Sequence, residues 1–160
     1  MTISAGDKLP DIDITLAANE GPQKTTTLEE LGKGKVVLFS VPGAYTPTCS
    51  ARHLPGFVQK VDEIKSKGVD KVACMAVNDA FVMKAWAEEH NALGKIDMIA
   101  DGNGDFTRAL GLTLDASGFG MGERSQRFAM LIEDGVVKDL FIEAPGAFEV
   151  SSAEYVLKKL

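Results

Sequence analysis

The stretch from Lys35 to Cys49, KVVLFSVPGAYTPTC, constrains the fold of this chain more than any other. Residues 36–39 are all apolar and two of them are β-branched, which is typical of a buried strand, and Pro42–Gly43 would end that strand. Thr46 and Pro47 then predict the start of a helix, with Thr46 as N-cap and Pro47 at the first helical position, where a missing N–H costs nothing.

This register places Cys49 at the third helical position, inside the first turn. Unpaired backbone N–H groups and the positive end of the helix dipole lie there, and both favour an anion. A cysteine in this position is expected to be a thiolate at neutral pH, which is the reactive form. We therefore interpret Cys49 as a reactive cysteine rather than as a small buried core residue, the usual role of a free cysteine.

The whole chain, residues 1–160, predicts a single domain of alternating strands and helices. Strands are expected at 12–16, 25–27, 35–41, 72–77, 96–100, 128–132 and 136–142, and helices at 27–30, 47–67, 80–89, 106–110 and beyond 151. This order predicts an α/β fold, with a central mixed sheet and helices on both faces. Strands 35–41 and 72–77 should be parallel, and Cys49 falls beyond their carboxyl ends, where such sheets carry their sites.

Some local patterns predict where elements begin. Thr27–Glu30 and Ser151–Glu154 match the capping box that opens a helix. The glycine-rich stretch 111–122 is expected to be a loop, followed by a hairpin across Glu133–Gly135.

Two of the predicted helices allow more specific predictions. Phe81, Ala85 and Trp86 should share one side of their helix and pack against the core. Pro55 lies inside the helix that follows Pro47 and removes a backbone hydrogen bond, so a kink is expected there.

Composition narrows the class of protein. The net charge of −6 argues against nucleic acid or an anionic membrane as a partner. No stretch approaches the roughly 20 apolar residues of a membrane span, and the first residues do not resemble a signal peptide. The 2 cysteines do not form a disulfide scaffold, so a reducing compartment, the cytoplasm, is expected, with a mature organellar form as the alternative.

A thiolate at Cys49 needs a nearby cation. Spacing alone does not choose among the arginines, which are Arg52, Arg108, Arg124 and Arg127. His53 lies four residues after Cys49 on the same helix, so a Cys–His pair is a second arrangement to consider.

No metal site or cofactor is expected. Cys49 and His53 have helical spacing, but neither Cys74 nor His90 stands at a spacing that would complete a metal site. The glycines between 102 and 122 fit no phosphate-binding loop, because none follows a strand and opens a helix in the required way.

The segment Pro42–Cys49 resembles the Pro-x-x-x-Thr-x-x-Cys signature of the peroxiredoxins. The stretches HLPGF at 53–57, VNDAFVM at 77–83 and RSQRFAM at 124–130 are similar to the type II, or peroxiredoxin 5-like, branch of that family. The similarity extends over nearly the whole chain. It implies a thioredoxin-like fold with an N-terminal β-hairpin.

The resemblance also implies roles for individual residues. Cys49 would be the peroxidatic cysteine, which attacks a peroxide and becomes a sulfenic acid. Thr46 would hold the peroxide through its hydroxyl, Arg127 would be the cation at the sulfur, and Pro42 would shield the thiolate from water.

Further residues would bind the substrate. The backbone N–H groups of Thr48 and Cys49 would complete a cradle for the leaving oxygen, where negative charge develops. Gly43 and His53 belong to the same implied substrate-binding set.

The sulfenic acid must be reduced by a second thiol. Some members of this branch carry a resolving cysteine near the C-terminus, but residues 141–152 contain none. Cys74 occupies a position that is resolving in some relatives, yet it lies in the middle of an apolar strand, where a buried and inert thiol is expected. Glutathione with glutaredoxin is therefore the expected reductant, and thioredoxin is the second choice.

The resulting hypothesis is a thiol-dependent peroxidase that acts on hydrogen peroxide and small alkyl hydroperoxides. A thiol–disulfide oxidoreductase is disfavoured because the chain has Thr-x-x-Cys where that chemistry needs Cys-x-x-Cys. A non-catalytic redox sensor is the third alternative. A homodimer is expected from the resemblance and from the apolar side chains of the 111–122 stretch.

Overall fold

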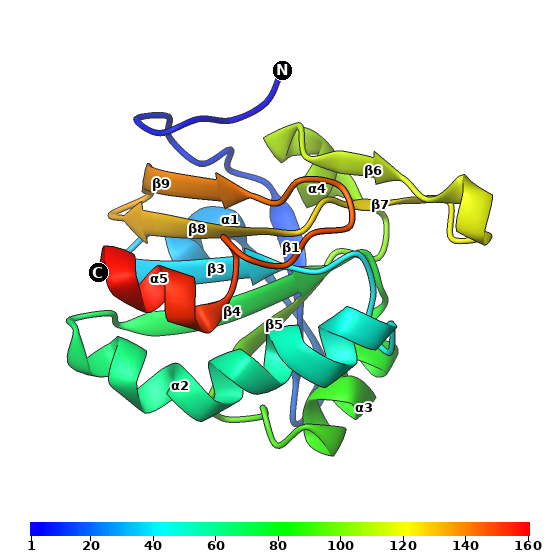
Figure 1. Cartoon of the computed structure of the whole chain (residues 1–160), viewed down its shortest axis with the longest axis horizontal. Coiled ribbons are helices and arrows are strands. Elements are labelled where there is room, and N and C mark those ends of the chain that lie inside the picture. The colour runs from blue at the N-terminus through cyan, green and yellow to red at the C-terminus, as the bar shows by residue number, and fades with distance from the viewer.

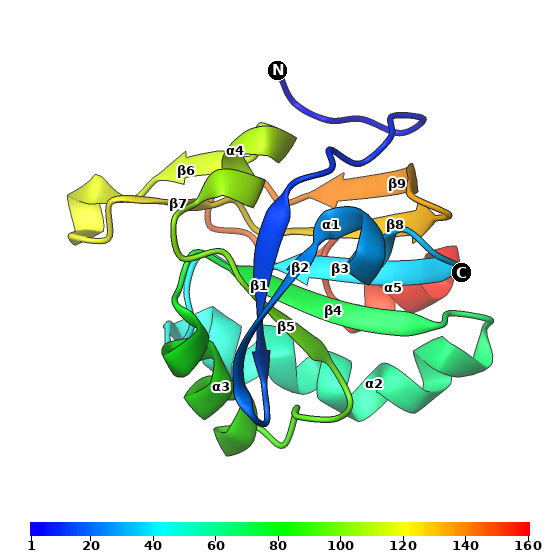
Figure 2. The same ribbon diagram turned by 180° about the vertical axis from the view of Figure 1, so that it is seen from behind.

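A mixed sheet of 7 strands runs through the molecule in the order β2-β1-β5-β4-β3-β8-β9 (Figures 1 and 2). The computed structural model describes all residues from 1 to 160. The strands are β1 (Asp13–Ala18), β2 (Gly21–Thr26), β3 (Lys35–Ser40), β4 (Lys71–Ala76), β5 (Asp97–Ala100), β6 (Thr113–Asp115), β7 (Glu123–Ser125), β8 (Phe128–Glu133) and β9 (Val136–Ile142). The helices are α1 (Thr27–Leu31), α2 (Leu54–Ser66), α3 (Ala80–Glu89), α4 (Asp105–Leu110) and α5 (Ala153–Lys159), and two short turns are η1 (Cys49–His53) and η2 (Ser117–Phe119).

The pairing of the strands confirms the predicted α/β fold. β3 and β4 are parallel, with Val36 opposite Lys71, and β5 is parallel to β4. β8 then pairs with β3 in the antiparallel direction, which makes the sheet mixed. The N-terminal hairpin of β1 and β2 is present, and its pairing with β5 through Thr15 and Leu16 extends the sheet in a way that the sequence had not indicated.

Helices cover both faces of the sheet. On one face, α2, α3 and α5 pack against the side chains of Val37, Phe39 and Cys74. On the other, α1 and α4 pack against alternate residues of the same strands, such as Leu38 and Met75. None of the helices has the length and apolar character that crossing a membrane would require.

Two helix starts differ from the predicted ones by a single residue. The N-cap of α1 is Thr26, whose hydroxyl accepts the N–H of Glu29, and the N-cap of α5 is Ser152, whose hydroxyl accepts the N–H of Tyr155. The hydroxyl of Thr27 donates to the carbonyl of Pro10, while that of Ser151 donates to a buried carboxylate. Long-range partners therefore decided between neighbouring hydroxyls that the local pattern could not separate.

The buried side of α3 also corrects the prediction. Trp86 is fully buried together with Met83, whereas Phe81 is 72% exposed and Ala85 is exposed. Residues 81 and 86 are five apart, which places them well away from each other around a helix of 3.6 residues per turn. The indole N–H of Trp86 donates to the hydroxyl of Ser50 at 2.9 Å, so this helix contacts the turn that carries Cys49.

The stretch 111–122 is not only a loop. Its first part forms β6, which pairs with β7 just beyond the stretch, and η2 lies at the tip of this small separate hairpin. Each strand has only 3 residues, which is too short for a periodic pattern to be read from the sequence. Leu112 is buried in the core, and Phe119 at the tip is exposed.

Candidate active site

Cys49 lies beyond the carboxyl end of β3, where the fold was expected to place a site. The helix begins at Pro47, so Cys49 is its third residue as predicted, and its side chain is fully buried. The preceding loop is tied to the end of β4, because the N–H of Ala44 donates to Oδ1 of Asn78 at 2.9 Å. Tyr45 in this loop has a φ of 63°, the left-handed region that non-glycine residues adopt at a cost, often at functional sites.

The first turn that carries Cys49 is wider than an α-helix. Residues 49–53 form a π-helical turn, in which the N–H of Leu54 donates to the carbonyl of Cys49. The irregularity expected at Pro55 thus takes the form of a widened turn directly before it. Turns of this type are rare and occur frequently at functional sites.

Arg127 supplies the cation at the sulfur. Its Nη2 atom donates to Sγ of Cys49 at 3.1 Å. The residue directly precedes β8, and the pairing of β8 with β3 brings it to the end of the strand that leads to Cys49.

The other arginines point elsewhere. Arg108 pairs with Asp105 and Glu123 on the surface. Arg52 lies over the ring of Phe148, and Arg124 donates to the carbonyls of Met121 and Val77. The structure therefore makes the choice that sequence spacing left open.

His53 does not pair with Cys49, which corrects the Cys–His arrangement considered from the sequence. Its Nδ1 atom accepts from Nη1 of Arg127 at 2.7 Å, and its Nε2 atom donates to the carbonyl of Ser151 at 2.9 Å. Burial and the charge of Arg127 lower the pKa of His53 to about 3. The imidazole is therefore neutral, with one ring nitrogen as acceptor and the other as donor, and both are occupied.

A buried carboxylate that the sequence analysis missed holds the next part of this network. Oε2 of Glu143 accepts the N–H of Glu149 at 2.7 Å, the N–H of Ser151 at 2.8 Å and the hydroxyl of Ser151 at 2.6 Å. Burial alone would raise the pKa of Glu143, but these hydrogen bonds outweigh it and lower the pKa. A single acidic residue after a strand carries no local signal, so only the tertiary structure identifies it.

These contacts form one continuous chain of hydrogen bonds. It runs from Glu143 through Ser151 and His53 to Arg127 and ends at the sulfur of Cys49. The guanidinium is thus held by the loop between β9 and α5, while the backbone of Arg127 is fixed directly before β8, where its carbonyl accepts the N–H of Glu143.

Thr46 stands directly before the helix, but it does not make the predicted capping bond. Its hydroxyl donates to the carbonyl of Gly43 at 2.7 Å, which leaves the lone pairs of the hydroxyl oxygen unused. The backbone N–H groups of Thr48 and Cys49 donate to no acceptor within the protein. The first turn therefore presents unused donors next to the sulfur, as the sequence predicted for a helix start.

Gly43 and Pro42 lie in the packed loop before Thr46. A Cβ atom on Gly43 would come within 3.0 Å of Nη1 of Arg124 and 3.3 Å of Cγ2 of Thr46, so a larger residue would displace neighbours. Pro42 is half-buried beside it.

Cys74 lies in the middle of β4, opposite Phe39 of β3, and is fully buried. Burial, and to a lesser extent the nearby Cys49, raises the pKa of its thiol well above the usual range. Both cysteines are free thiols. No group of three His, Cys, Asp or Glu side chains is placed so that it could hold a metal ion.

Comparisons with known proteins agree with this geometry. The Redoxin family model matches residues 4–157. The chloroplastic peroxiredoxin-2E-2 of Oryza sativa subsp. japonica is 53% identical over 165 residues, which covers 99% of this chain and 73% of that protein. Peroxiredoxin-2B of Arabidopsis thaliana is 46% identical, covering 99% of this chain and 98% of that protein. The crystal structure of reduced Prx3 from Vibrio vulnificus in complex with hydrogen peroxide is 52% identical, with a TM-score of 0.94 and coverage of 99% of both chains.

Proposed function

Since the chain belongs to the Redoxin family as a type II peroxiredoxin, and is thus a thiol-dependent peroxidase, we propose that Cys49 is its peroxidatic cysteine. The observation that carries this proposal is the 3.1 Å contact from the guanidinium of Arg127 to the sulfur. Arginine stays charged and has fixed donors, so it stabilises negative charge on the sulfur throughout the reaction.

The proposed reaction begins with attack of the thiolate on the hydroxyl oxygen of a hydroperoxide, either hydrogen peroxide or a small alkyl hydroperoxide. An S–O bond forms, and the O–O bond breaks with its electron pair leaving on the second oxygen. That oxygen takes a proton from solvent and departs as water or an alcohol. The sulfur is oxidised to a sulfenic acid, and the peroxide is reduced.

Several residues around Cys49 are proposed to hold the peroxide. The free N–H groups of Thr48 and Cys49 and the guanidinium of Arg127 can donate to oxygens on which charge develops. The hydroxyl of Thr46, whose own hydrogen is donated to Gly43, can accept a hydrogen bond from the O–H group of the bound hydroperoxide. Pro42 would shield the sulfur from water.

We assign His53 a role other than the substrate contact expected from the resemblance. Both of its ring nitrogens are occupied by Arg127 and Ser151. His53 is therefore proposed as a positioning residue, which orients the guanidinium by accepting one of its N–H groups.

The reductant is proposed to be external. Cys74 is buried in the middle of a strand and its thiol pKa is raised, which disfavours the thiolate that would be needed for attack on a sulfenic acid. Reduction by glutathione with glutaredoxin is favoured, and thioredoxin is the alternative. Reduction must precede further oxidation to the sulfinic acid.

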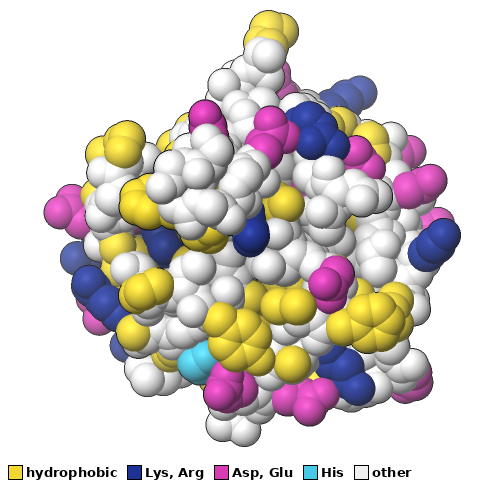
Figure 3. All heavy atoms as spheres, turned by 90° about the vertical axis from the view of Figure 1, so that its right-hand side faces the viewer, with side chains coloured by type: hydrophobic (Ala, Val, Ile, Leu, Met, Phe, Trp, Pro, Cys, Tyr) yellow, Lys and Arg dark blue, Asp and Glu magenta, His cyan; other side chains and the backbone are white.

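A homodimer is proposed from exposed aromatic side chains. Phe119 at the tip of the β6–β7 hairpin is 87% exposed, and Phe81 and Tyr45 are also exposed. Figure 3 views the side of the molecule where this tip lies in Figure 1, and several groups of hydrophobic side chains are exposed there among acidic ones. Such groups mark interaction surfaces more often than isolated apolar residues do.

The cytoplasm is proposed as the compartment. Two free cysteines fit a reducing environment. Two relatives are named as chloroplastic, which supports the alternative of a mature organellar protein.

The test compares two cysteine variants. Cys49→Ser should abolish peroxide consumption, because the only other thiol, Cys74, lies in the middle of β4 with its pKa raised, while Cys74→Ser should retain it. Mass spectrometry after one equivalent of hydrogen peroxide should find one added oxygen on Cys49 in the wild type.

Three outcomes would contradict the proposal. They are full turnover of Cys49→Ser, reduction of insulin disulfides in the absence of peroxide, and absence of the sulfenic acid. Absence of the sulfenic acid would favour the alternative of a non-catalytic redox sensor.

A further inference from the structure

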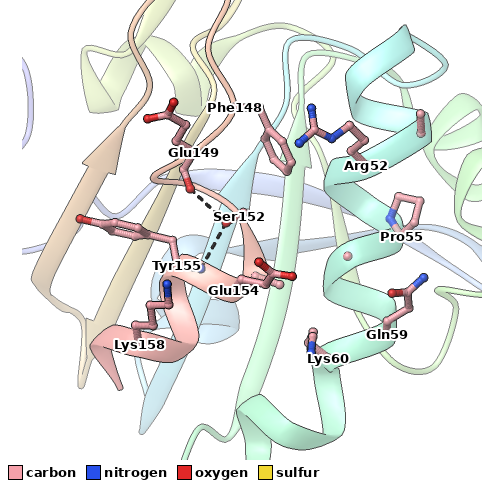
Figure 4. A pocket seen from close by; sticks show the side chains of 13 residues that line it. Arg52, Pro55, Gln59, Lys60, Phe148, Glu149, Ser152, Glu154, Tyr155 and Lys158 are labelled. Atoms are coloured by element: carbon pink, nitrogen blue, oxygen red, sulfur yellow. Dashed lines mark hydrogen bonds between the residues drawn. The ribbon is translucent and has the colours of Figure 1, made fainter.

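A charged groove lies between α2 and α5, next to the loop that leads into α5 (Figure 4). Its volume is about 470 Å³, which is within the range of pockets that hold small ligands. It is lined by residues from η1 and α2 on one side and by residues 148–158 on the other. None of the proposed roles around Cys49 uses this groove.

The side chains of the groove present charges of both signs. Arg52 lies at the end near Phe148, Lys60 and Lys158 lie at the opposite end, and Glu154 lies between them (Figure 4). Arg52, Lys158 and Glu154 form no ion pair within the protein, and Lys60 has only a 4.0 Å contact with Glu63. These charges are therefore available to a ligand.

The groove adjoins the active site through Phe148. The ring centroid of Phe148 lies 4.7 Å from the guanidinium carbon of Arg52 in the groove and 5.8 Å from that of Arg127 at the sulfur. The same ring is 5.0 Å from the ring of His53. A ligand at the Arg52 end of the groove is thus separated from the network around Cys49 by one side chain.

We propose that this groove binds the reductant, and that the reductant is a small peptide thiol with a carboxylate at each end and an ammonium group. The cations at the two ends of the groove suit the two carboxylates, and Glu154 suits the ammonium. Glutathione has this set of groups and is the probe for the test. The inference rests on the proposed function, because it needs the sulfenic acid of Cys49 as the group to be reduced.

The chemical step balances without a further reagent. The thiolate of the bound peptide attacks the sulfur of the sulfenic acid, an S–S bond forms and the S–O bond breaks. The departing hydroxide takes the proton released by the peptide thiol and leaves as water. A second peptide thiol then attacks the mixed disulfide, so that Cys49 returns to the thiol and the peptide leaves as its disulfide.

The test uses the double variant Lys60→Gln/Lys158→Gln in the full-length protein. After oxidation with one equivalent of hydrogen peroxide, its rate constant for reduction by glutathione should fall about fivefold, because two favourable charge contacts are lost. Reduction by the uncharged thiol 2-mercaptoethanol and the rate of oxidation by peroxide should not change. Unreactive S-methylglutathione should shift the NMR signals of groove residues in the wild type and not in the variant.

A matched control is Lys24→Gln/Lys33→Gln, which removes the same charge from exposed lysines outside the groove and should leave all rates unchanged. The inference is overturned if both double variants lower the glutathione rate equally, if the mercaptoethanol rate falls as much as the glutathione rate, or if S-methylglutathione shifts only signals elsewhere. A failure of the proposed function would look different, because no sulfenic acid would then form on Cys49.

Discussion

His53 shows how a single residue can act on a reactive group that it does not touch. Its ring is buried among Phe39, Phe57 and Phe148, and it contacts the guanidinium that contacts the sulfur. A neutral imidazole is required for this contact, because a doubly protonated ring could not accept from arginine. The low pKa of His53 is therefore part of how Arg127 is oriented.

The variant His53→Gln tests this role. We expect its rate constant for oxidation by hydrogen peroxide to fall about tenfold, because a guanidinium that is less well positioned stabilises the transition state less. Stopped-flow measurement of the first turnover gives this rate. His90→Gln removes the other histidine, which lies outside the network, and should keep the wild-type rate. Equal rates for all three proteins would refute the role.

The same residue predicts a pH dependence of stability. In the unfolded chain the pKa of histidine is about 6.5, whereas in the folded protein that of His53 is about 3. Between these values the unfolded state binds a proton that the folded state does not, so stability is full above pH 6.5 and falls as the pH is lowered toward 3. Relative to His53→Gln, the wild type should lose about 1.4 kcal/mol of unfolding free energy per pH unit in this window, measured by urea denaturation. Parallel curves for the two proteins would contradict this.

Sequence reasoning located Cys49 but not its surroundings. The strand, the turn and Pro47 fix the position of Cys49 at a helix start through contacts that are local in sequence. Arg127 lies 78 residues away and reaches the sulfur only because β8 pairs with β3. The choice of Arg127 came from the family resemblance, and Glu143 was not found at all, because its partners are set by a loop whose path no local pattern predicts.

At the scale of elements, α1 is joined to the sheet by a lysine shared between two carboxylates. Nζ of Lys71 lies 3.1 Å from Glu30 and 3.6 Å from Asp97, and it also donates to the carbonyl of Glu30. Burial, followed by the effect of Asp97, raises the pKa of Glu30 to about 7. Below about pH 7 the folded protein therefore favours the neutral form of this side chain.

Glu30→Gln should make the protein more stable at alkaline pH. Between the unfolded pKa of about 4.5 and the folded pKa of about 7, the folded state binds a proton that the unfolded state does not, so the stability contributed by this proton is present below pH 4.5 and lost as the pH rises past 7. The glutamine should raise the unfolding free energy by about 1 kcal/mol at pH 8 and give no gain at pH 4. Glu29→Gln, on the exposed side of α1, is the control. A gain that is independent of pH would argue against this explanation.

Whole strands and helices were easier to predict than their limits. The strands β3, β4 and β8 were predicted from their unbroken apolar runs, and the helix α2 from its helical periodicity. The starts of α1 and α5 were each missed by one residue, because Thr26 and Thr27, and likewise Ser151 and Ser152, are equally good caps until their distant partners are known. The side of α3 that faces the core was misjudged for a different reason, because residues 81 and 86 are five apart and cannot share one side of an α-helix.

At the scale of the molecule, all the major elements pack on one sheet, which supports the proposal that residues 1–160 form a single domain. The β6–β7 hairpin is the exception, since it projects from the body with Phe119 at its tip (Figure 1). A projecting apolar tip is suited to contact with a second molecule.

Phe119→Ser should therefore weaken the proposed dimer at least tenfold, because exposed aromatic anchors contribute much of the energy of an interface. Sedimentation equilibrium at micromolar concentration would measure the change. Ile142→Ser, which removes an exposed apolar residue from β9, should leave the dimer intact. A wild-type protein that is only monomeric at these concentrations would exclude the dimer.

The hydrogen-bond chain from Glu143 to Cys49 joins residues 143–151 to the turn at residues 49–53, which lie about 100 positions earlier in the sequence. During synthesis, Cys49 leaves the ribosome long before Arg127, Ser151 and Glu143 exist. The network around the sulfur can therefore form only after residue 151 has been synthesised. A chain cut before residue 127 would lack the guanidinium that contacts the sulfur.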